Sequence, residues 1–183
     1  MSSGIREYGP TIFKDFIGKP IRLLEIGVYD GRSAVWFLEN LLTHPNSDYL
    51  GVDLVTGHEE AHLRAKANLE VFRPKVTLVK ADSMEYLPRL YRWDNKYDIV
   101  HIDGDHGFTT CVSDLSYSWN LLNPNGIVLL DDYHRDDYEV YKAVHTFLAS
   151  QQPSKYEIVH LGYMIAFKKL PSATVFNNDY TGA

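Results

Sequence analysis

Residues 23–42 read LLEIGVYDGRSAVWFLENLL and pass from an apolar strand into an apolar helix through a short turn. Gly27 and Gly31 permit a tight turn, because glycine tolerates backbone angles that strain other residues. A dinucleotide-binding fingerprint, G-x-G-x-x-G, needs its middle glycine so that the backbone can touch a pyrophosphate. Tyr29 occupies that position here. The stretch therefore predicts a turn for a ligand without phosphates, in which Ser33 and the helix N-terminus can hold a carboxylate.

Short apolar runs and helical periods alternate along the rest of the chain. The predicted strands are residues 21–26, 49–53, 76–80, 97–102 and 126–131, and the predicted helices between them include 33–42, 59–72, 112–122 and 140–148. This repeat predicts an α/β fold with a doubly wound, mostly parallel sheet. Residues 156–161 and 164–168 lie too close together for an intervening helix. They predict an antiparallel C-terminal hairpin, which brings the sheet to seven strands.

The 183 residues divide into an N-terminal helical segment at 1–20, a main domain at 21–170 and a polar tail at 171–183. In the first segment, apolar residues at positions 12, 13, 16 and 17 recur at helical spacing. That segment either packs on the core or covers a substrate. Because it is short, the site is expected to be open, and a second subunit, the tail or a large acceptor could close it. A homo-oligomer is therefore compatible with the sequence.

Composition excludes several classes of function. The formal net charge of −6 would repel a nucleic-acid backbone rather than bind it. Cys111 is the only cysteine, which excludes an internal disulfide. Apolar runs such as 127–130 are far shorter than the ~20 residues of a membrane span, and the N-terminus lacks the apolar core of a signal peptide. We expect a cytoplasmic protein that binds neither nucleic acid nor membrane.

Polar residues follow the second and third predicted strands. Asp53 ends the second strand, where a carboxylate can accept both hydroxyls of a ribose, although it could also form a turn. Asp82 and Ser83 follow the third strand and could meet an adenine edge. Asp82 is equally well placed to cap the next helix, so both interpretations stay open.

Acidic residues gather after the fourth and fifth predicted strands, where residues 101–106 read HIDGDH and residues 131–134 read DDYH. Strand order reverses between the first and fourth strands of a doubly wound sheet, and ligands bind in the crevice there. The acidic residues are Asp103, Asp105, Asp114, Asp131, Asp132, Asp136, Asp137 and Glu139, with Arg135 the only Lys or Arg among them. They repel one another unless a cation or solvent relieves the charge. Oxygen ligands favour Mg²⁺, Mn²⁺ or Ca²⁺.

A competing metal motif occurs at residues 58–62, HEEAH, which fits the H-E-x-x-H pattern of zinc hydrolases. Thr56 and Glu59 also fit a capping box, which would give Glu59 a structural task at a helix start. Positions 65 and 68 hold Ala and Asn, so a third ligand is missing at the extended spacing. We interpret this zinc motif as accidental.

Four ordered stretches carry a family resemblance: LLEIGVYDGRSAV, VTLVKADSMEYLPRL, YDIVHIDGDH and LNPNGIVLLDDY. Together they resemble the class I S-adenosylmethionine-dependent methyltransferases, nearest the catechol O-methyltransferase group and its metal-dependent relatives that methylate sugars. The resemblance spans roughly residues 21–133 and implies a Rossmann-like methyltransferase fold. The turn at residues 27–31 is suited to a ligand that has a carboxylate and no phosphates. S-adenosylmethionine is such a ligand.

By this resemblance Gly27, Tyr29 and Ser33 line the methionine part of the cofactor, Asp53 holds the ribose and Ser83 borders the adenine. The full set of candidate cofactor residues is Glu25, Gly27, Tyr29, Gly31, Ser33, Asp53, Asp82, Ser83 and Asp103. The resemblance assigns the metal ligands as Asp103, Asp131 and Asp132. Catechol enzymes have Asn at the place of Asp132 and a lysine base at the place of His106, whereas sugar-modifying relatives share the Asp.

These features predict a divalent-metal-dependent O-methyltransferase that acts on a hydroxyl of a small molecule such as a vicinal diol, sugar or phenol. S-adenosyl-L-methionine and Mg²⁺, or Mn²⁺ or Ca²⁺, are its expected cofactors, and His106 and Asp103 its catalytic residues. A cofactor-binding protein without catalysis is the alternative. A nicotinamide-dependent oxidoreductase is disfavoured by Tyr29.

Overall fold

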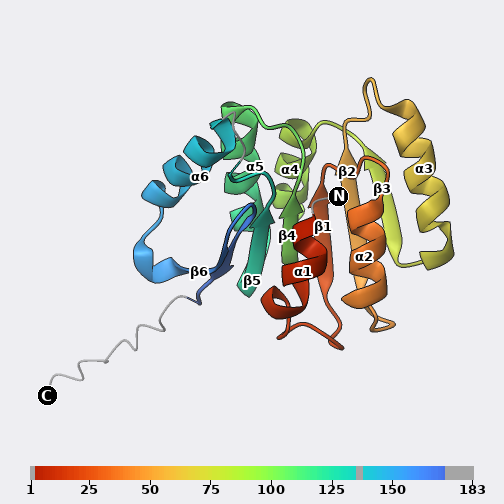
Figure 1. Cartoon of the computed structure of the whole chain (residues 1–183), viewed down its shortest axis with the longest axis horizontal. Helices are drawn as coiled ribbons and strands as arrows, with labels where there is room; N and C mark the ends of the chain where they lie inside the picture. Colours follow the sequence, from red (N-terminus) through yellow and green to blue (C-terminus); the bar gives the residue numbers. More distant parts are fainter. Residues whose placement is uncertain (1–2, 135–137, 172–183) are drawn as a thin grey trace, which may run out of the picture.

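The computed structural model describes residues 3–134 and 138–171. Seven strands form one sheet in the order β3-β2-β1-β4-β5-β7-β6 (Figure 1). The strands are β1 (Arg22–Ile26), β2 (Asp48–Asp53), β3 (Val76–Lys80), β4 (Tyr97–Ile102), β5 (Leu122–Leu130), β6 (Tyr156–Leu161) and β7 (Ile165–Lys169). Strands β1 to β5 are parallel, whereas β7 runs antiparallel to both β5 and β6. This confirms the predicted doubly wound sheet and its antiparallel C-terminal hairpin.

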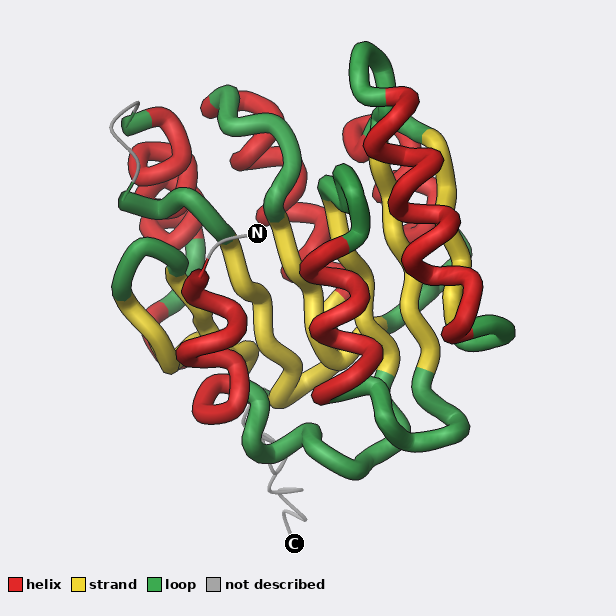
Figure 2. Tube along the Cα trace, turned by 45° about the vertical axis from the view of Figure 1, so that its right-hand side comes forward, coloured by secondary structure: helices red, strands yellow, loops and turns green. Residues whose placement is uncertain are grey.

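Helices cover both faces of the sheet, and Figure 2 shows one layer of them in front of the strands. The helices are α1 (Ser3–Ile12), α2 (Arg32–Asn40), α3 (Glu59–Leu69), α4 (Ser83–Arg92), α5 (Phe108–Leu121) and α6 (Glu139–Ser150), with 3-10 turns at Glu70–Phe72 and Pro153–Lys155. The front layer holds α1, α2 and α3, and the opposite face carries α4, α5 and α6. The sheet is therefore the middle of three layers.

Alternation along each strand explains the two cores. Leu24 and Ile26 of β1 belong to the core shared with α4, α5 and α6, while Leu23 belongs to the core under α1 and α2. Successive side chains of a strand point to opposite faces, so a strand covered on both faces is apolar throughout. Glu25 and His101 share the face of Leu23 and are the polar exceptions, both fully buried.

Several predicted boundaries are confirmed, notably those of β3, β4 and β6. The prediction of β5 at residues 126–131 was too short at its start, because Leu122 pairs with Tyr97 across a shift in register. The N-terminal helix was also placed wrongly. It covers Ser3–Ile12, and the apolar residues 13 and 16 lie in the turns that follow it.

Helix α1 packs on the core rather than standing over an opening. Ile5 and Phe13 are buried in the front core, and Tyr8 lies 4.6 Å from the His160 ring, centroid to centroid. A Cβ on Gly4 would meet Met164, so α1 also contacts the segment between β6 and β7. The predicted polar tail lies outside the described residues except for its first position. Within the described ranges, the structure contains no helix with the length and apolar character of a bilayer span.

Asp114 is a buried acid in the middle of α5. Its side chain has no exposed surface, and neither carboxylate oxygen has a hydrogen-bond partner among the described residues. Burial raises the pKa of Asp114 from 3.8 to about 7, a change that the Ser83 hydroxyl opposes and that Asp82 and Asp105 increase. A buried charge without a partner is costly, so this carboxyl stays protonated at pH values where an exposed aspartate is ionised.

Asp114→Asn should therefore change how stability depends on pH. The folded pKa of the wild-type group lies above its unfolded value, so its contribution is fully present below pH 3.8 and is lost as pH rises through about 7. The variant lacks this loss and should gain stability relative to wild type by on the order of 4 kcal/mol between pH 4 and pH 8. Urea denaturation at both pH values measures the difference. An offset between the two proteins that is the same at both pH values would contradict the assignment.

Candidate functional site

The turn between β1 and α2 has a backbone that few sequences tolerate. Gly27 and Gly31 have φ values of 84° and 81°, and Tyr29 also has a positive φ of 51°. A Cβ on Gly27 would lie 2.1 Å from the carbonyl oxygen of Asp103. The glycine is therefore required both by its conformation and by the close approach of the loop after β4.

Asp53, the last residue of β2, holds this turn in place. One of its carboxylate oxygens accepts hydrogen bonds from the backbone N–H groups of Val28 and Tyr29, both at 2.7 Å. The other oxygen accepts from the N–H of Val55, also at 2.7 Å. A carboxylate can accept about four hydrogen bonds, so three backbone donors leave limited capacity for a ligand. The turn-forming role that the sequence left open is thus present in the structure.

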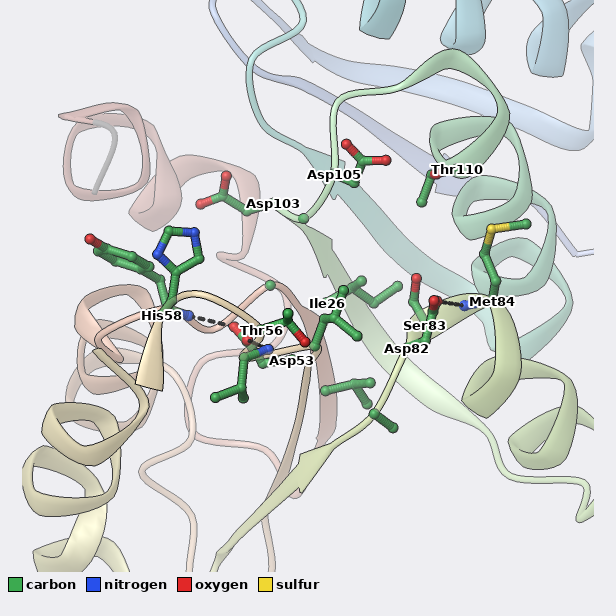
Figure 3. A pocket seen from close by; sticks show the side chains of 17 residues that line it. Ile26, Asp53, Thr56, His58, Asp82, Ser83, Met84, Asp103, Asp105 and Thr110 are labelled. Atoms are coloured by element: carbon green, nitrogen blue, oxygen red, sulfur yellow. Dashed lines mark hydrogen bonds between the residues drawn. The ribbon is translucent and has the colours of Figure 1, made fainter. Parts of the chain in front are cut away.

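A cavity of about 460 Å³ opens at the carboxyl ends of four neighbouring parallel strands. Figure 3 shows the side chains of Asp53, His58, Ser83 and Asp103 around it, each from a different segment. The lining residues are Ile26, Gly27, Tyr29, Val52, Asp53, Leu54, Val55, Thr56, His58, Ala81, Asp82, Ser83, Met84, Asp103, Gly104, Asp105 and Thr110. Its volume and mixture of apolar walls with a few polar groups are typical of a small-molecule site.

Six of the nine candidate cofactor residues line this cavity: Gly27, Tyr29, Asp53, Asp82, Ser83 and Asp103. Glu25, Gly31 and Ser33 are not among its lining residues. Gly31 caps α2, and Ser33 is buried in the first turn of that helix. Sequence reasoning missed His58, Met84 and Thr110. The rule that ligands bind beyond the carboxyl ends of parallel strands points to the first two, which follow β2 and β3.

Asp82 combines both interpretations that the sequence left open. Its side chain accepts a hydrogen bond of 2.9 Å from the N–H of Met84 and so caps α4. It also lines the cavity beside Ser83. The capping interaction fixes the end of the cavity that faces β3.

The acidic residues after β4 and β5 form two groups that could each hold a metal ion. Within each group, the possible ligand atoms all lie within 4.8 Å of one another. One group is His101, Asp103 and Asp131, and the other is Asp103, His106 and Asp132. Burial raises the pKa of Asp103 to about 7, while His101 acts against this change and Asp131 adds to it. Asp131 and Asp132 thus fall in different groups, although Asp103 belongs to both. Asp136 and Asp137 lie outside the described residues.

Asp132 is engaged on both carboxylate oxygens. Tyr163, from the loop between β6 and β7, donates its hydroxyl to Oδ1. His106 lies with its Nε2 2.8 Å from Oδ2. Asp132 itself has a positive φ of 58°, which is uncommon for a residue other than glycine. The structure therefore joins Asp132 to the candidate base His106 and to the C-terminal hairpin.

Glu25 lies beneath the cavity in a buried polar network. Its Oε1 is 2.8 Å from Nδ1 of His101, and Tyr49 donates its hydroxyl to Oε2. The two residues stand opposite each other in the β1–β4 pairing. Burial lowers the pKa of His101, but the hydrogen bond and charge of Glu25 outweigh it, so the pKa is raised. The pair was not predicted from the sequence.

The zinc motif at residues 58–62 forms no metal group in the described part of the chain. His58 is the N-cap of α3 and packs edge-on against Tyr29, with ring centroids 5.4 Å apart. The capping-box prediction was wrong, because the helix begins at Glu59 with His58 as its N-cap, and not at residue 57. Glu59 accepts instead from the N–H of Gly57, at 3.4 Å.

Comparison with known families gives one match that covers most of the chain. A family model described as a methyltransferase domain matches residues 24–133. An uncharacterized protein of Acanthamoeba polyphaga mimivirus is 27% identical over 139 residues, which make up 73% of this chain. The matched region covers 62% of that protein, so the chain spans less than two thirds of its relative.

Solved structures share the fold at low sequence identity. The O-methyltransferase from Bacillus cereus, in complex with SAH, has a TM-score of 0.65 at 17% identity, over 81% of this chain and 74% of that chain. An rRNA methylase from Streptococcus thermophilus has a TM-score of 0.69 at 9% identity, over 93% of this chain and 99% of that chain. The topology is therefore common to enzymes with different acceptors.

The contact between Gly27 and the loop after β4 is testable by two alanine variants. Gly57 has a φ of 79°, close to that of Gly27, but nothing lies within 4 Å of where its Cβ would stand. Gly57→Ala should cost about 1–2 kcal/mol of unfolding free energy from backbone strain alone. Gly27→Ala should cost about 1–3 kcal/mol more, because Asp103 must move. Urea denaturation measures both, and equal losses would show that the two loops do not depend on this contact.

Proposed function

The chain belongs to the methyltransferase domain family, and we propose that this class I S-adenosylmethionine-dependent enzyme methylates a hydroxyl of a small molecule with the help of a divalent cation. The position of Asp103 carries this proposal. Asp103 lines the cavity and also belongs to both groups that could hold a metal ion. An acceptor oxygen held by that ion would thus lie beside the cofactor, as in-line transfer of a methyl group requires.

For the cofactor, we assign the apolar end of the cavity to the adenosine. Met84 and Ser83 would border the adenine, and Asp53 would take the ribose hydroxyls with the hydrogen-bonding capacity left by the turn. Gly27 and Tyr29 would line the methionine part. Glu25, Gly31 and Ser33 do not line the cavity, and we assign them to the packing of the turn between β1 and α2.

For the cation, the donor chemistry of the site fits a divalent ion. Asp103 and Asp131 supply carboxylates, and a ring nitrogen of His101 lies within 4.8 Å of their oxygens. Nε2 of that ring is buried and has no hydrogen-bond partner in the described chain. Asp132, the third ligand implied by the family resemblance, already interacts with Tyr163 and His106. When bound, such an ion lowers the pKa of an acceptor hydroxyl and holds neighbouring oxygens in place.

His106 is our candidate for the general base. Its Nε2 lies 2.8 Å from Asp132, and the same carboxylate is fixed on its other side by Tyr163. A carboxylate that orients an imidazole in this way is a common arrangement around catalytic histidines. His106 is partly exposed and so can be reached by an acceptor.

A small acceptor fits the charge of this chain better than RNA does. The formal net charge is −6, and the groups around the proposed reaction centre are carboxylates. Proteins that bind nucleic acid gain most of their affinity from Lys and Arg at the phosphates. We therefore do not propose RNA as the acceptor of this chain, although an rRNA methylase shares its fold.

Binding of S-adenosylhomocysteine tests the assignment of Asp53. Asp53→Ala should weaken binding about 10- to 100-fold, because charged hydrogen bonds contribute about 1.5–3 kcal/mol each. Asp48→Ala is the matched control, since Asp48 begins the same strand and forms an ion pair with Arg22 at 3.1 Å. Calorimetry gives the affinities and circular dichroism checks folding. Unchanged affinity in a folded Asp53 variant would remove that residue from the site.

Methyl transfer from labelled cofactor to diols, sugars and phenols tests the reaction itself. Exhaustive chelation should abolish turnover, and Mg²⁺ or Mn²⁺ should restore it, while binding of S-adenosylhomocysteine changes little. Chelated enzyme that keeps its full rate would rule out the metal and leave His106 to remove the acceptor proton alone. Cofactor binding without transfer to any acceptor class would favour a protein without catalysis.

A further inference from the structure

His101 is held rigidly below the acidic residues. It lies on β4 and is fully buried, with Nδ1 2.8 Å from Oε1 of Glu25. Tyr49 donates to the other oxygen of Glu25, and the edge of Phe37 packs on the imidazole with ring centroids 5.3 Å apart. These contacts leave the ring one orientation, in which Nε2 is the only ring nitrogen not bonded to Glu25.

Nε2 of His101 is an unsatisfied polar atom. It is buried and has no hydrogen-bond partner among the residues that the structure describes. A ring nitrogen of His101 and carboxylate oxygens of Asp103 and Asp131 lie within 4.8 Å of one another, and Nδ1 is already committed to Glu25. Buried polar atoms without partners are rare and costly, so the unpartnered Nε2 of a ring that lies beside two carboxylates points to a ligand.

From this geometry we propose that Nε2 of His101 is a ligand of the divalent ion, together with Asp103 and Asp131, and that Glu25 orients the ring. The inference rests on the metal dependence proposed above. Histidines that bind metals usually donate their other ring N–H to a carboxylate, which fixes the tautomer. The Glu25–His101 contact is that arrangement, and it is present within the protein itself.

The bonding of Asp132 supports this choice of ligands. Its two oxygens interact with Tyr163 and His106, so a metal at Asp132 would share a carboxylate that already has a partner on each oxygen. Asp131 does not share these partners. Its carboxylate accepts from the N–H of Asp132 at 3.0 Å, which holds it near the end of β5. Asp132 thus orients His106, and the ion lies on the side of Asp131 and His101.

A nitrogen ligand changes which ion the site prefers. Mg²⁺ and Ca²⁺ select oxygen ligands, whereas an imidazole raises affinity for transition ions. A site made of one imidazole and two carboxylates should therefore bind Mn²⁺ or Co²⁺ more tightly than Mg²⁺. The preference should be larger than that of a site made of carboxylates alone.

Pulsed electron paramagnetic resonance of the whole chain with Mn²⁺ tests the proposal without any mutation. An imidazole bound to Mn²⁺ gives a ¹⁴N modulation, and growth on ¹⁵N-labelled histidine should replace it with the ¹⁵N pattern. His101→Gln should remove the modulation, whereas His106→Asn should keep it. Glu25→Gln preserves the shape of the orienting group and should raise the Kd for Mn²⁺ about 10- to 100-fold, as loss of an outer-shell partner does.

The outcomes separate this inference from the proposed function. Tight Mn²⁺ binding with no histidine modulation would overturn the ligand assignment and leave the metal dependence standing, with His101 acting as a counter-charge. A modulation lost in the His106 variant and kept in the His101 variant would also overturn it. Failure of Mn²⁺ to bind at all would overturn both. If the His101 variant does not fold, the labelled wild type and the His106 variant still decide between the two histidines.

Discussion

The site depends on the close approach of two backbone segments, the turn after β1 and the loop after β4. The Gly27 backbone lies so near the carbonyl of Asp103 that no side chain fits between them. Asp53 fixes the first segment through three backbone N–H groups, and the parallel pairing of β1 with β4 aligns the second. Because both segments begin at the same edge of the sheet, cavity and acidic residues share one wall. The family's chemistry requires this proximity of cofactor and acceptor.

The wall shared by the cavity and the acidic residues has different ionisable groups on its two sides. On the cavity side, Asp103 is buried enough that its pKa is raised to about 7. Beneath it, the Glu25–His101 pair places an imidazole close to Asp103 and Asp131. The network is expensive to bury, and its hydrogen bonds restrict the side chains of Glu25 and His101 to few arrangements. Precise positions matter more here than stability does.

The sequence predicts local features of this protein better than pairings between distant residues. Short apolar runs are enough to place β3, β4 and β6, because such runs bounded by turn residues favour strands. It misplaces the start of β5, since pairing of Leu122 depends on a shift in register that only the neighbouring strand reveals. Motif spacing likewise identifies Asp53 and Asp103 as candidates. It gives no sign that Glu25 meets His101 or that Tyr163 meets Asp132, because each pair forms only after the chain has folded.

Tyr163 links the acidic residues to a segment that is synthesised late. Every other partner of the acidic cluster described above comes from residues 25–132, whereas Tyr163 enters from the turn between the last two strands. Strand β7 must insert between β5 and β6 before that contact exists. Chains emerge from the ribosome at roughly 5–20 residues per second, and a domain generally folds as a unit. The Tyr163 contact of Asp132 therefore cannot form until the hairpin has left the ribosome.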